Sequence, residues 1–195
     1  MKNSLTKRQE EIIEVAIRLI SEEGIQNLTI RRLAAGVGVT EPALYRHFTN
    51  KFDILDTILD CFEDKSDAVL AQLTDKTVTP ADKIRIFIFD RIDRMMRNPH
   101  LARVIFSEEI FQDDERLAKK VLMIMHSHGR KLQEIVKQGQ DQGMIRSDIE
   151  PIVMFRLIFG PVRLLIKQWC LSGFAFNLEE EGQKLWDALK LILKA

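Results

Sequence analysis

The 195-residue chain is predicted to be all-helical, with about nine helices divided between a three-helix amino-terminal domain and a larger carboxy-terminal helical domain. Three observations support this fold class. Apolar residues recur at the three- and four-residue spacing of helices, and no alternating run bounded by a hairpin turn occurs. Only 9 glycines and 5 prolines interrupt the chain. We place the two domains at residues 1–52 and 53–195.

The composition limits the possible classes of protein. There are 29 basic and 29 acidic residues, and 46% of the residues are hydrophobic, so intrinsic disorder and a uniformly basic nucleic-acid coat protein are both disfavoured. The amino terminus has no apolar core of a signal peptide, and two cysteines in no paired motif suit a reducing compartment. The longest apolar stretch, residues 152–171, is interrupted by Arg156, Arg163 and Lys167. We therefore expect a cytoplasmic protein with no membrane association and no cofactor.

The first helix has clear signals at both ends. Thr6 and Gln9 have the spacing of a capping box, and Gly24 is a suitable terminator. The apolar residues between them recur at i, i+3, i+4 and i+7, which predicts one buried face: Ile13, Ala16, Ile17 and Ile20.

Two short helices are expected next. Thr29 can cap one that runs to about Ala35, and Thr40 can cap another that runs to about Phe48. The residues between them, 36–39, form a predicted four-residue turn with two glycines. Two short helices joined by a tight, glycine-containing turn are typical of a helix-turn-helix.

Proline, glycine and capping residues divide the rest of the chain. A helix is expected from Asn50 to about Leu73, and another from Pro80 to about Arg97. Further helices are expected after residue 98, from about 113 to 142, from 151 to an end at Gly173 with a kink at 160–161, and after a cap at Asn177.

The helix that starts at Thr40 carries the side chains with the most informative chemistry. On a helical wheel Leu44 and Phe48 face inward together, whereas Pro42, Tyr45 and Arg46 face outward and His47 lies at the border. A major groove admits one helix, and such side chains can read base edges or bind phosphate. The spacing alone leaves DNA binding and an ordinary surface helix about equally open.

The same segment resembles the amino-terminal signature of TetR-family transcriptional regulators. The residues that carry the resemblance are Thr29-Ile30-Arg31-Arg32-Leu33-Ala34, Gly38-Val39-Thr40-Glu41-Pro42-Ala43-Leu44-Tyr45-Arg46-His47-Phe48, Asn50-Lys51 and Ile54-Leu55. The resemblance covers about residues 6–60. It implies an all-helical homodimer in which each subunit places one recognition helix in a major groove of operator DNA, and a carboxy-terminal domain that binds a small effector.

The resemblance also implies roles for individual residues. Positions that contact phosphate are matched by Thr29, Tyr45, His47 and Lys51, and Thr40 is both a helix cap and a backbone contact. Arg31 matches a position that reaches a base in some members. The variable positions that choose the operator are occupied by Glu41, Pro42 and Arg46. For His47 the alternative is a half-buried packing residue. Arg32 is at least as readily an ion-paired arginine. The carboxylate of Glu41 repels phosphate but can accept from cytosine N4.

Two helices of the carboxy-terminal domain have apolar faces suited to a dimer interface. Residues 152–171 are apolar apart from one narrow polar stripe, which predicts burial on more than one side. The last helix has a seam at i, i+7, i+11 and i+14: Leu178, Leu185, Leu189 and Ile192. These helices can pair with their symmetry mates as a four-helix interface, or complete the core of a monomer.

The carboxy-terminal domain also holds most of the phenylalanines and methionines. The resemblance places several of them around an effector cavity, and methionine suits irregular apolar ligands. The candidates are Phe87, Met95, Phe106, Phe111, Met123, Phe155 and Phe159, each of which can equally be plain core. As a group these residues favour a lipophilic effector, and Arg156 or Arg163 could pair with its anionic head group or form an interface ion pair.

Enzyme chemistry is not indicated. His126 and His128 diverge by about 160° on a helix, so they cannot share a metal, and no catalytic residue, metal site or glycine-rich phosphate loop is predicted. The sequence therefore predicts a DNA-binding transcriptional regulator, a homodimeric repressor of a palindromic operator that a small effector releases. A non-regulatory dimer that organises the chromosome is the alternative, and activation in place of repression stays open.

Overall fold

The computed structural model describes residues 5–72, 77–107, 109–112 and 114–194. Within these residues the chain forms ten α-helices and one short 3₁₀ helix and contains no strand, which confirms the predicted fold class. The elements are α1 (Lys7–Glu23), η1 (Ile25–Asn27), α2 (Ile30–Val37), α3 (Glu41–Tyr45), α4 (Lys51–Gln72), α5 (Pro80–Arg97), α6 (Pro99–Ile105), α7 (Glu109–Gln112), α8 (Glu115–Asp141), α9 (Pro151–Leu171) and α10 (Leu178–Leu193).

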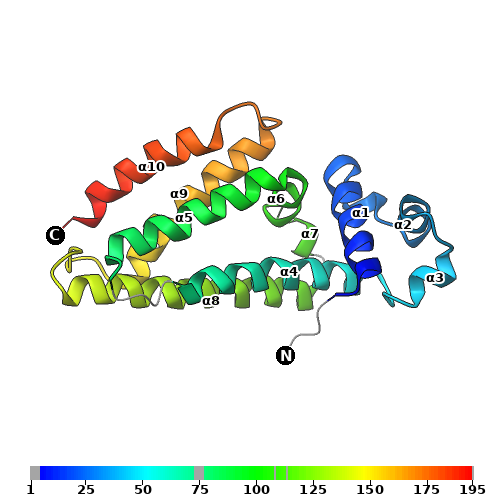
Figure 1. The fold of residues 1–195 in the computed structure, drawn as a ribbon, viewed down its shortest axis with the longest axis horizontal. Coiled ribbons are helices and arrows are strands. Elements are labelled where there is room, and N and C mark those ends of the chain that lie inside the picture. Colours follow the sequence, from blue (N-terminus) through cyan, green and yellow to red (C-terminus); the bar gives the residue numbers. More distant parts are fainter. Residues whose placement is uncertain (1–4, 73–76, 108, 113, 195) are drawn as a thin grey trace.

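The helices form a small domain at one end of an elongated larger one. Helices α1, α2 and α3 lie together at one end, and α3 is far from the carboxy terminus (Figure 1). In the larger domain, α4 and α8 lie side by side along one edge, with α5, α9 and α10 along the other. Helix α4 runs from the small domain into the large one, so the boundary expected after Phe52 falls within its first turn.

The small domain is built on α1. The predicted capping box is present: the Gln9 backbone N–H donates to Thr6 Oγ1 at 3.3 Å, and the Thr6 N–H donates to Gln9 Oε1 at 3.0 Å. The apolar face of α1 is buried against α2 and the start of α4. Its buried residues are Ile12, Ile13, Ala16, Ile17 and Ile20.

The turn between α2 and α3 is shorter than predicted. Gly36 and Val37 belong to α2, and the turn spans residues 38–40. Gly38 adopts the left-handed conformation, with φ of 73°, and its N–H bonds to carbonyls of the last turn of α2. Gly36 serves packing instead, because a Cβ there would lie 2.7 Å from Cγ1 of Val15 on α1.

Helix α3 is also shorter than the sequence suggested. It has five residues and ends at Tyr45, so Arg46, His47 and Phe48 lie in the following turn. The next helix has its own capping system, in which the Thr49 N–H donates to Asp53 Oδ2 at 3.0 Å and the Asp53 N–H donates to Asn50 Oδ1 at 3.0 Å. The Thr49 bonds hold the pKa of Asp53 below its usual value.

The boundaries in the larger domain follow the capping signals closely. Helix α5 starts at Pro80 behind a Thr79 cap, and α10 starts at Leu178 behind an Asn177 cap. The short helix α7 was not predicted. The expected end of the fourth helix at Leu73, and the expected start of α8 at Asp113, lie outside the described residues. None of the described helices combines the length and apolar character that crossing a membrane requires.

Packing at the far end of α8 gives a testable consequence. A Cβ on Gly139 would lie 2.6 Å from Ile145 Cδ1 and 3.0 Å from Pro80 Cβ, inside a fully packed junction. We expect Gly139→Ala to destabilise the chain by about 1–3 kcal/mol, because both neighbours are buried and must shift. Chemical denaturation measures this loss. The control Gln138→Ala, at an exposed position on the same turn, should change stability by less than about 0.5 kcal/mol. Equal stability of the two variants would contradict the packing argument.

Candidate nucleic-acid interface and ligand cavity

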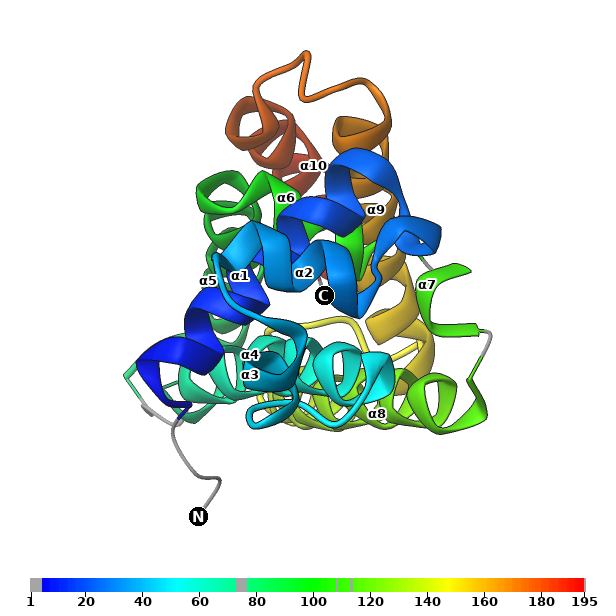
Figure 2. The same ribbon diagram turned by 90° about the vertical axis from the view of Figure 1, so that its right-hand side faces the viewer.

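Helix α3 is mounted as an exposed element at the end of the small domain. The Thr40 hydroxyl accepts the Ala43 N–H at the start of the helix, and Leu44 is completely buried beneath it. Viewed end-on, α3 lies on the outer side of the domain in front of α4 (Figure 2). A helix this short is stable only when it packs against other elements, so its position is set by the core of α1, α2 and α4.

The outward residues of this region match those expected from the helical wheel. Glu41, Pro42, Tyr45 and Arg46 are exposed, as is Arg31 on α2, and His47 is half-buried. Neither Arg31 nor Arg46 forms an ion pair with any part of the chain that the structure describes. Their guanidinium groups can therefore bind an external partner.

Two threonines hold helix ends and remain exposed. The Thr29 hydroxyl accepts the Arg32 N–H at 3.2 Å, and the Thr40 hydroxyl accepts the Ala43 N–H at 3.4 Å. A hydroxyl that accepts a bond still has its own O–H to donate. Both groups can therefore cap a helix and donate to an external acceptor.

Two basic side chains near α3 are used within the chain. Arg32 pairs with Glu23 and donates to Asn27 Oδ1 at 2.8 Å, which agrees with the ion-paired alternative. The Lys51 ammonium donates to the Ile25 carbonyl at 2.8 Å, so it ties α4 to η1. A phosphate contact by Lys51 stays a prediction.

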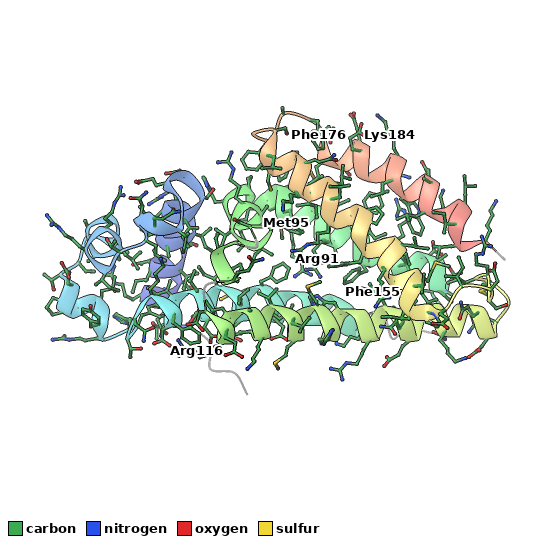
Figure 3. All side chains as sticks on the ribbon, turned by 180° about the vertical axis from the view of Figure 1, so that it is seen from behind. Arg91, Met95, Arg116, Phe155, Phe176 and Lys184 are labelled. Atoms are coloured by element: carbon green, nitrogen blue, oxygen red, sulfur yellow. The ribbon has the colours of Figure 1, made fainter. Side chains whose placement is uncertain are left out.

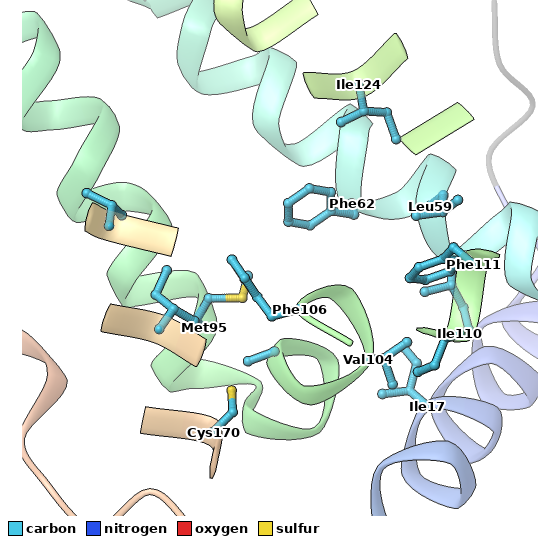
Figure 4. Packing of buried hydrophobic residues seen from close by; sticks show 14 of the residues in the cluster. Ile17, Leu59, Phe62, Met95, Val104, Phe106, Ile110, Phe111, Ile124 and Cys170 are labelled. Atoms are coloured by element: carbon cyan, nitrogen blue, oxygen red, sulfur yellow. The ribbon is translucent and has the colours of Figure 1, made fainter. Parts of the chain in front are cut away.

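The larger domain encloses a small cavity between α4, α5, α6, α8 and α9. Its volume is about 40 Å³, which suits one or two waters and no larger molecule. Phe62, Ile124 and Phe106 point toward this interior region from α4, α8 and the end of α6 (Figure 4). The lining residues are Leu59, Phe62, Arg91, Ile105, Phe106, Val121, Ile124, Met125, His128, Phe159, Val162, Arg163 and Ile166.

Two polar groups are buried in this apolar lining. Arg91 is 3% exposed and His128 is 1% exposed. Burial is the main cause that lowers the pKa of Arg91 to about 9, and that of His128 to about 3, with the Arg91 charge adding to the effect on the histidine. Arg91 lies in the interior of the domain, whereas Arg116 and Lys184 are on its outside (Figure 3).

The predicted effector residues divide into three groups. Phe106 and Phe159 line the cavity, and Phe87 lies next to it, because its ring contacts both Arg91 and His128. Met95, Phe111 and Phe155 pack elsewhere in the domain. Met123 does not line the cavity: it is 68% exposed, because Ile124 occupies the inward-facing position on that turn of α8.

The sequence did not single out Phe62, Arg91 or His128 as lining residues. A signal was nevertheless present. The buried face of α5 runs through Ile84, Phe87 and Ile88 to Ile92 and Met95, and Arg91 stands within it. A charged residue inside an apolar stripe is uncommon and indicates a functional position more often than a surface residue does.

The expected dimer residues are only partly available to a partner. Leu178 and Leu189 are buried inside the chain, because α10 packs against α5 and α9, whereas Leu185 and Ile192 are half-buried. Part of the exposed apolar surface lies on the outer face of α9 and the neighbouring end of α10. Its residues are Val153, Leu157, Leu164 and Leu171, with Leu191 on α10.

Comparison with known proteins covers both domains. Residues 12–58 match the family described as bacterial regulatory proteins, tetR family, and residues 62–195 match the carboxy-terminal region of YsiA-like protein. Among curated proteins, the chain is 25% identical over 193 residues to the nucleoid occlusion factor SlmA of Actinobacillus pleuropneumoniae, covering 97% of this chain and 94% of that protein.

Solved structures show the same fold at low sequence identity. The fatty acid degradation regulator FadR from Bacillus halodurans has a TM-score of 0.85 at 18% identity, covering 96% of this chain and 97% of that one. The transcriptional regulator FadR from Bacillus subtilis in complex with stearoyl-CoA has a TM-score of 0.80 at 21% identity, covering 94% and 98% of the two chains.

Proposed function

Because the chain belongs to the TetR family of DNA-binding bacterial regulators, a family that is not enzymatic, we propose that it represses transcription as a homodimer on a palindromic operator and is released by a small lipophilic effector. The exposed face of α3 is the observation that carries this proposal. It presents a phenol and a carboxylate at the end of the molecule, on a helix that is fixed by a single buried leucine, and the guanidinium of Arg46 follows in the next turn.

A homodimer is supported by the outer face of α9. Four of its apolar side chains are exposed and lie on one side of the helix, and Leu164 and Leu171 are 57% and 78% exposed. A contiguous apolar stripe of this kind is typical of an interaction surface. Two copies joined there would place two recognition helices on half-sites about 34–36 Å apart.

A link between the cavity and the small domain supports release by an effector. Leu59 and Phe62 of α4 and Phe106 at the end of α6 line the cavity. Helix α6 also contacts α1, because His100 Nδ1 lies 3.0 Å from Ser21 Oγ. A ligand that enlarges the cavity would move α4 and α6, and with them the helices that present α3.

The alternative function is organisation of the chromosome without regulation of a promoter. The similarity to SlmA over nearly the whole chain favours it. Selection of bound fragments from a random DNA pool, followed by mapping of occupied sites in cells, tests both functions. One or a few palindromes at promoters support the repressor, many dispersed sites away from promoters support the alternative, and the absence of any salt-sensitive, sequence-selective complex contradicts both.

Arg46 and Lys51 should have different effects on DNA binding. We expect Arg46→Ala to cost about 1–3 kcal/mol on the preferred operator and to relax base preference, because the exposed Arg46 is assigned to base reading. Lys51→Ala should weaken all sequences alike and reduce the salt slope by about 1. Binding curves over a range of salt, on the operator and on scrambled DNA, measure both quantities. Identical effects of both variants on all sequences would contradict these assignments.

A further inference from the structure

The cavity of the larger domain contains an arginine, Arg91, with two guanidinium nitrogens that have no hydrogen-bond partner within the described residues. These nitrogens are Nε and Nη2, and both are buried. The guanidinium carbon lies 4.8 Å from the ring centroid of Phe62 and 5.1 Å from that of Phe87. The rings stabilise the cation through its faces, whereas its N–H groups point outward in the guanidinium plane. The rings therefore leave the N–H groups without acceptors.

Burying guanidinium donors without acceptors destabilises the folded chain when no ligand is bound. A buried donor without an acceptor loses its hydration and gains nothing in return, and the loss is larger for a charged group. Besides Pro80 and Lys83, the other buried positions of α5 are occupied by isoleucine, phenylalanine and methionine. A residue of that type would fill the position of Arg91 without this cost, so the arginine points to a ligand that supplies the acceptors.

The two unpartnered nitrogens define the shape of that acceptor. In Arg116, Nε and Nη2 donate to the two oxygens of Asp114 at 3.0 and 2.6 Å. In Arg146, the same two nitrogens donate to the two oxygens of Asp148 at 2.6 Å each. The edge of Arg91 formed by Nε and Nη2 therefore matches the two parallel acceptors of a carboxylate.

The surroundings favour an anion over a neutral group. Arg91 and Arg163 line the cavity, and its described lining contains no aspartate or glutamate. The neighbouring Asp90 is already paired with Arg94. His128 Nε2 is a further buried nitrogen without a partner in the described chain. The remaining lining is aliphatic, aromatic or methionine, which suits an apolar body attached to the anionic group.

We propose that the effector is an apolar monocarboxylate, a fatty or aryl acid, whose two carboxylate oxygens accept from Nε and Nη2 of Arg91 inside this cavity. The inference rests on the proposed function, in which the cavity is the effector site. It names the free acid and not an ester or thioester of the same chain, because the carbonyl end of an ester is uncharged and offers the guanidinium edge only one good acceptor oxygen. Because the cavity holds about 40 Å³, the apolar body must displace its walls, which would couple binding to movement of α4 and α6.

Calorimetry of the full-length protein tests the chemistry. The probes are decanoate, palmitate and benzoate, each beside its methyl ester, together with decanoyl-CoA. We expect at least one acid to bind, and its ester and thioester to bind about 30-fold more weakly or worse. Arg91→Met should reduce binding of the acid to the level of the ester and leave binding of the ester unchanged. Arg97→Met, at an exposed position on the same helix, is the matched control and should bind like the wild type.

Three results would overturn the inference: equal binding of acid and ester to the wild type, full binding of the acid by Arg91→Met, or no binding of any of these acids. Folding of the variant is checked by its melting temperature, which should equal or exceed that of the wild type because an unpaired buried charge is removed. Arg91→Lys keeps a charge but loses the two-pronged edge, and should bind the acid with intermediate affinity.

DNA binding separates this inference from the proposed function. Without ligand, Arg91→Met should bind the selected operator like the wild type, and the bound acid should release only the wild type. A wild type that binds no DNA selectively contradicts the regulator while leaving the calorimetric comparison valid. A wild type that binds its operator but discriminates no acid from its ester overturns the carboxylate and leaves a neutral lipophilic effector in place.

Discussion

Replacing Leu44 with alanine is expected to weaken operator binding by about 100-fold or more, which corresponds to about 2.7 kcal/mol. Leu44 is the one buried residue of the five-residue helix α3. Its truncation leaves a cavity beneath the helix at a cost of about 2–5 kcal/mol. A helix this short has no stability of its own, so α3 is the element that detaches. Electrophoretic mobility shifts with the selected operator measure the loss.

The loss should be local. Far-UV circular dichroism of Leu44→Ala should stay close to that of the wild type, because the other helices keep their packing, whereas amide hydrogen exchange should accelerate in α2 and α3. Leu44→Met approximately conserves volume and should retain most of the binding. Wild-type DNA affinity in Leu44→Ala would show that α3 is held by something other than this side chain.

Acidification is expected to destabilise the larger domain through His128. Its pKa is about 3 in the folded chain, against about 6.5 in an unfolded one. Below pH 6.5 the unfolded chain therefore binds a proton that the folded chain does not, and stability falls as pH falls toward 3. Between pH 6.5 and 4.5 this residue alone should cost about 2–3 kcal/mol. Desolvation is the first cause, followed by the positive charges of Arg91, Lys131 and Arg94.

A non-titrating variant isolates this contribution. His128→Phe retains a ring between Phe62 and Phe87, whose centroids lie 6.4 and 6.2 Å from that of His128. Urea denaturation at fixed protein concentration should show a smaller loss of stability in His128→Phe than in the wild type over this pH range. His126→Phe, at an exposed position on the same helix, should keep the acid sensitivity of the wild type. Parallel pH profiles for all three proteins would exclude His128 as the cause.

Helix boundaries could be predicted wherever a local signal starts or ends a helix. Pro80, Gly143 and Asn177 define boundaries through backbone geometry and capping, and these act within a few residues. The errors occurred where tertiary contact decides. Gly36 looks like part of a turn but allows α2 to approach Val15 of α1. The short α7 has no periodicity that would reveal it, because four residues cannot show a helical repeat.

The site residues could likewise be predicted where a single helix determines which side chains share a face, and not where several helices pack together. The exposed face of α3 follows from a helical wheel, since one helix fixes which of its own residues share a side. The cavity depends on the packing of five helices, and the sequence cannot show which apolar residues border it. Met123 and Ile124 are adjacent and both apolar, yet only Ile124 faces inward. Likewise, Leu178 and Leu189 have the spacing of a dimer seam but are used within the chain.

Because α4 is continuous across both domains, a small rotation at its cavity end would produce a larger displacement at the end beside α3. Phe62, at the cavity, and Lys51, beside the recognition helix, are separated by a helical length of about 17 Å. A rotation of about 10° about the cavity end would displace the Lys51 end by roughly 3 Å, and in a symmetric dimer the two displacements add to roughly 6 Å. Since successive base pairs are about 3.4 Å apart, that change puts the half-site spacing out of register by nearly two base pairs.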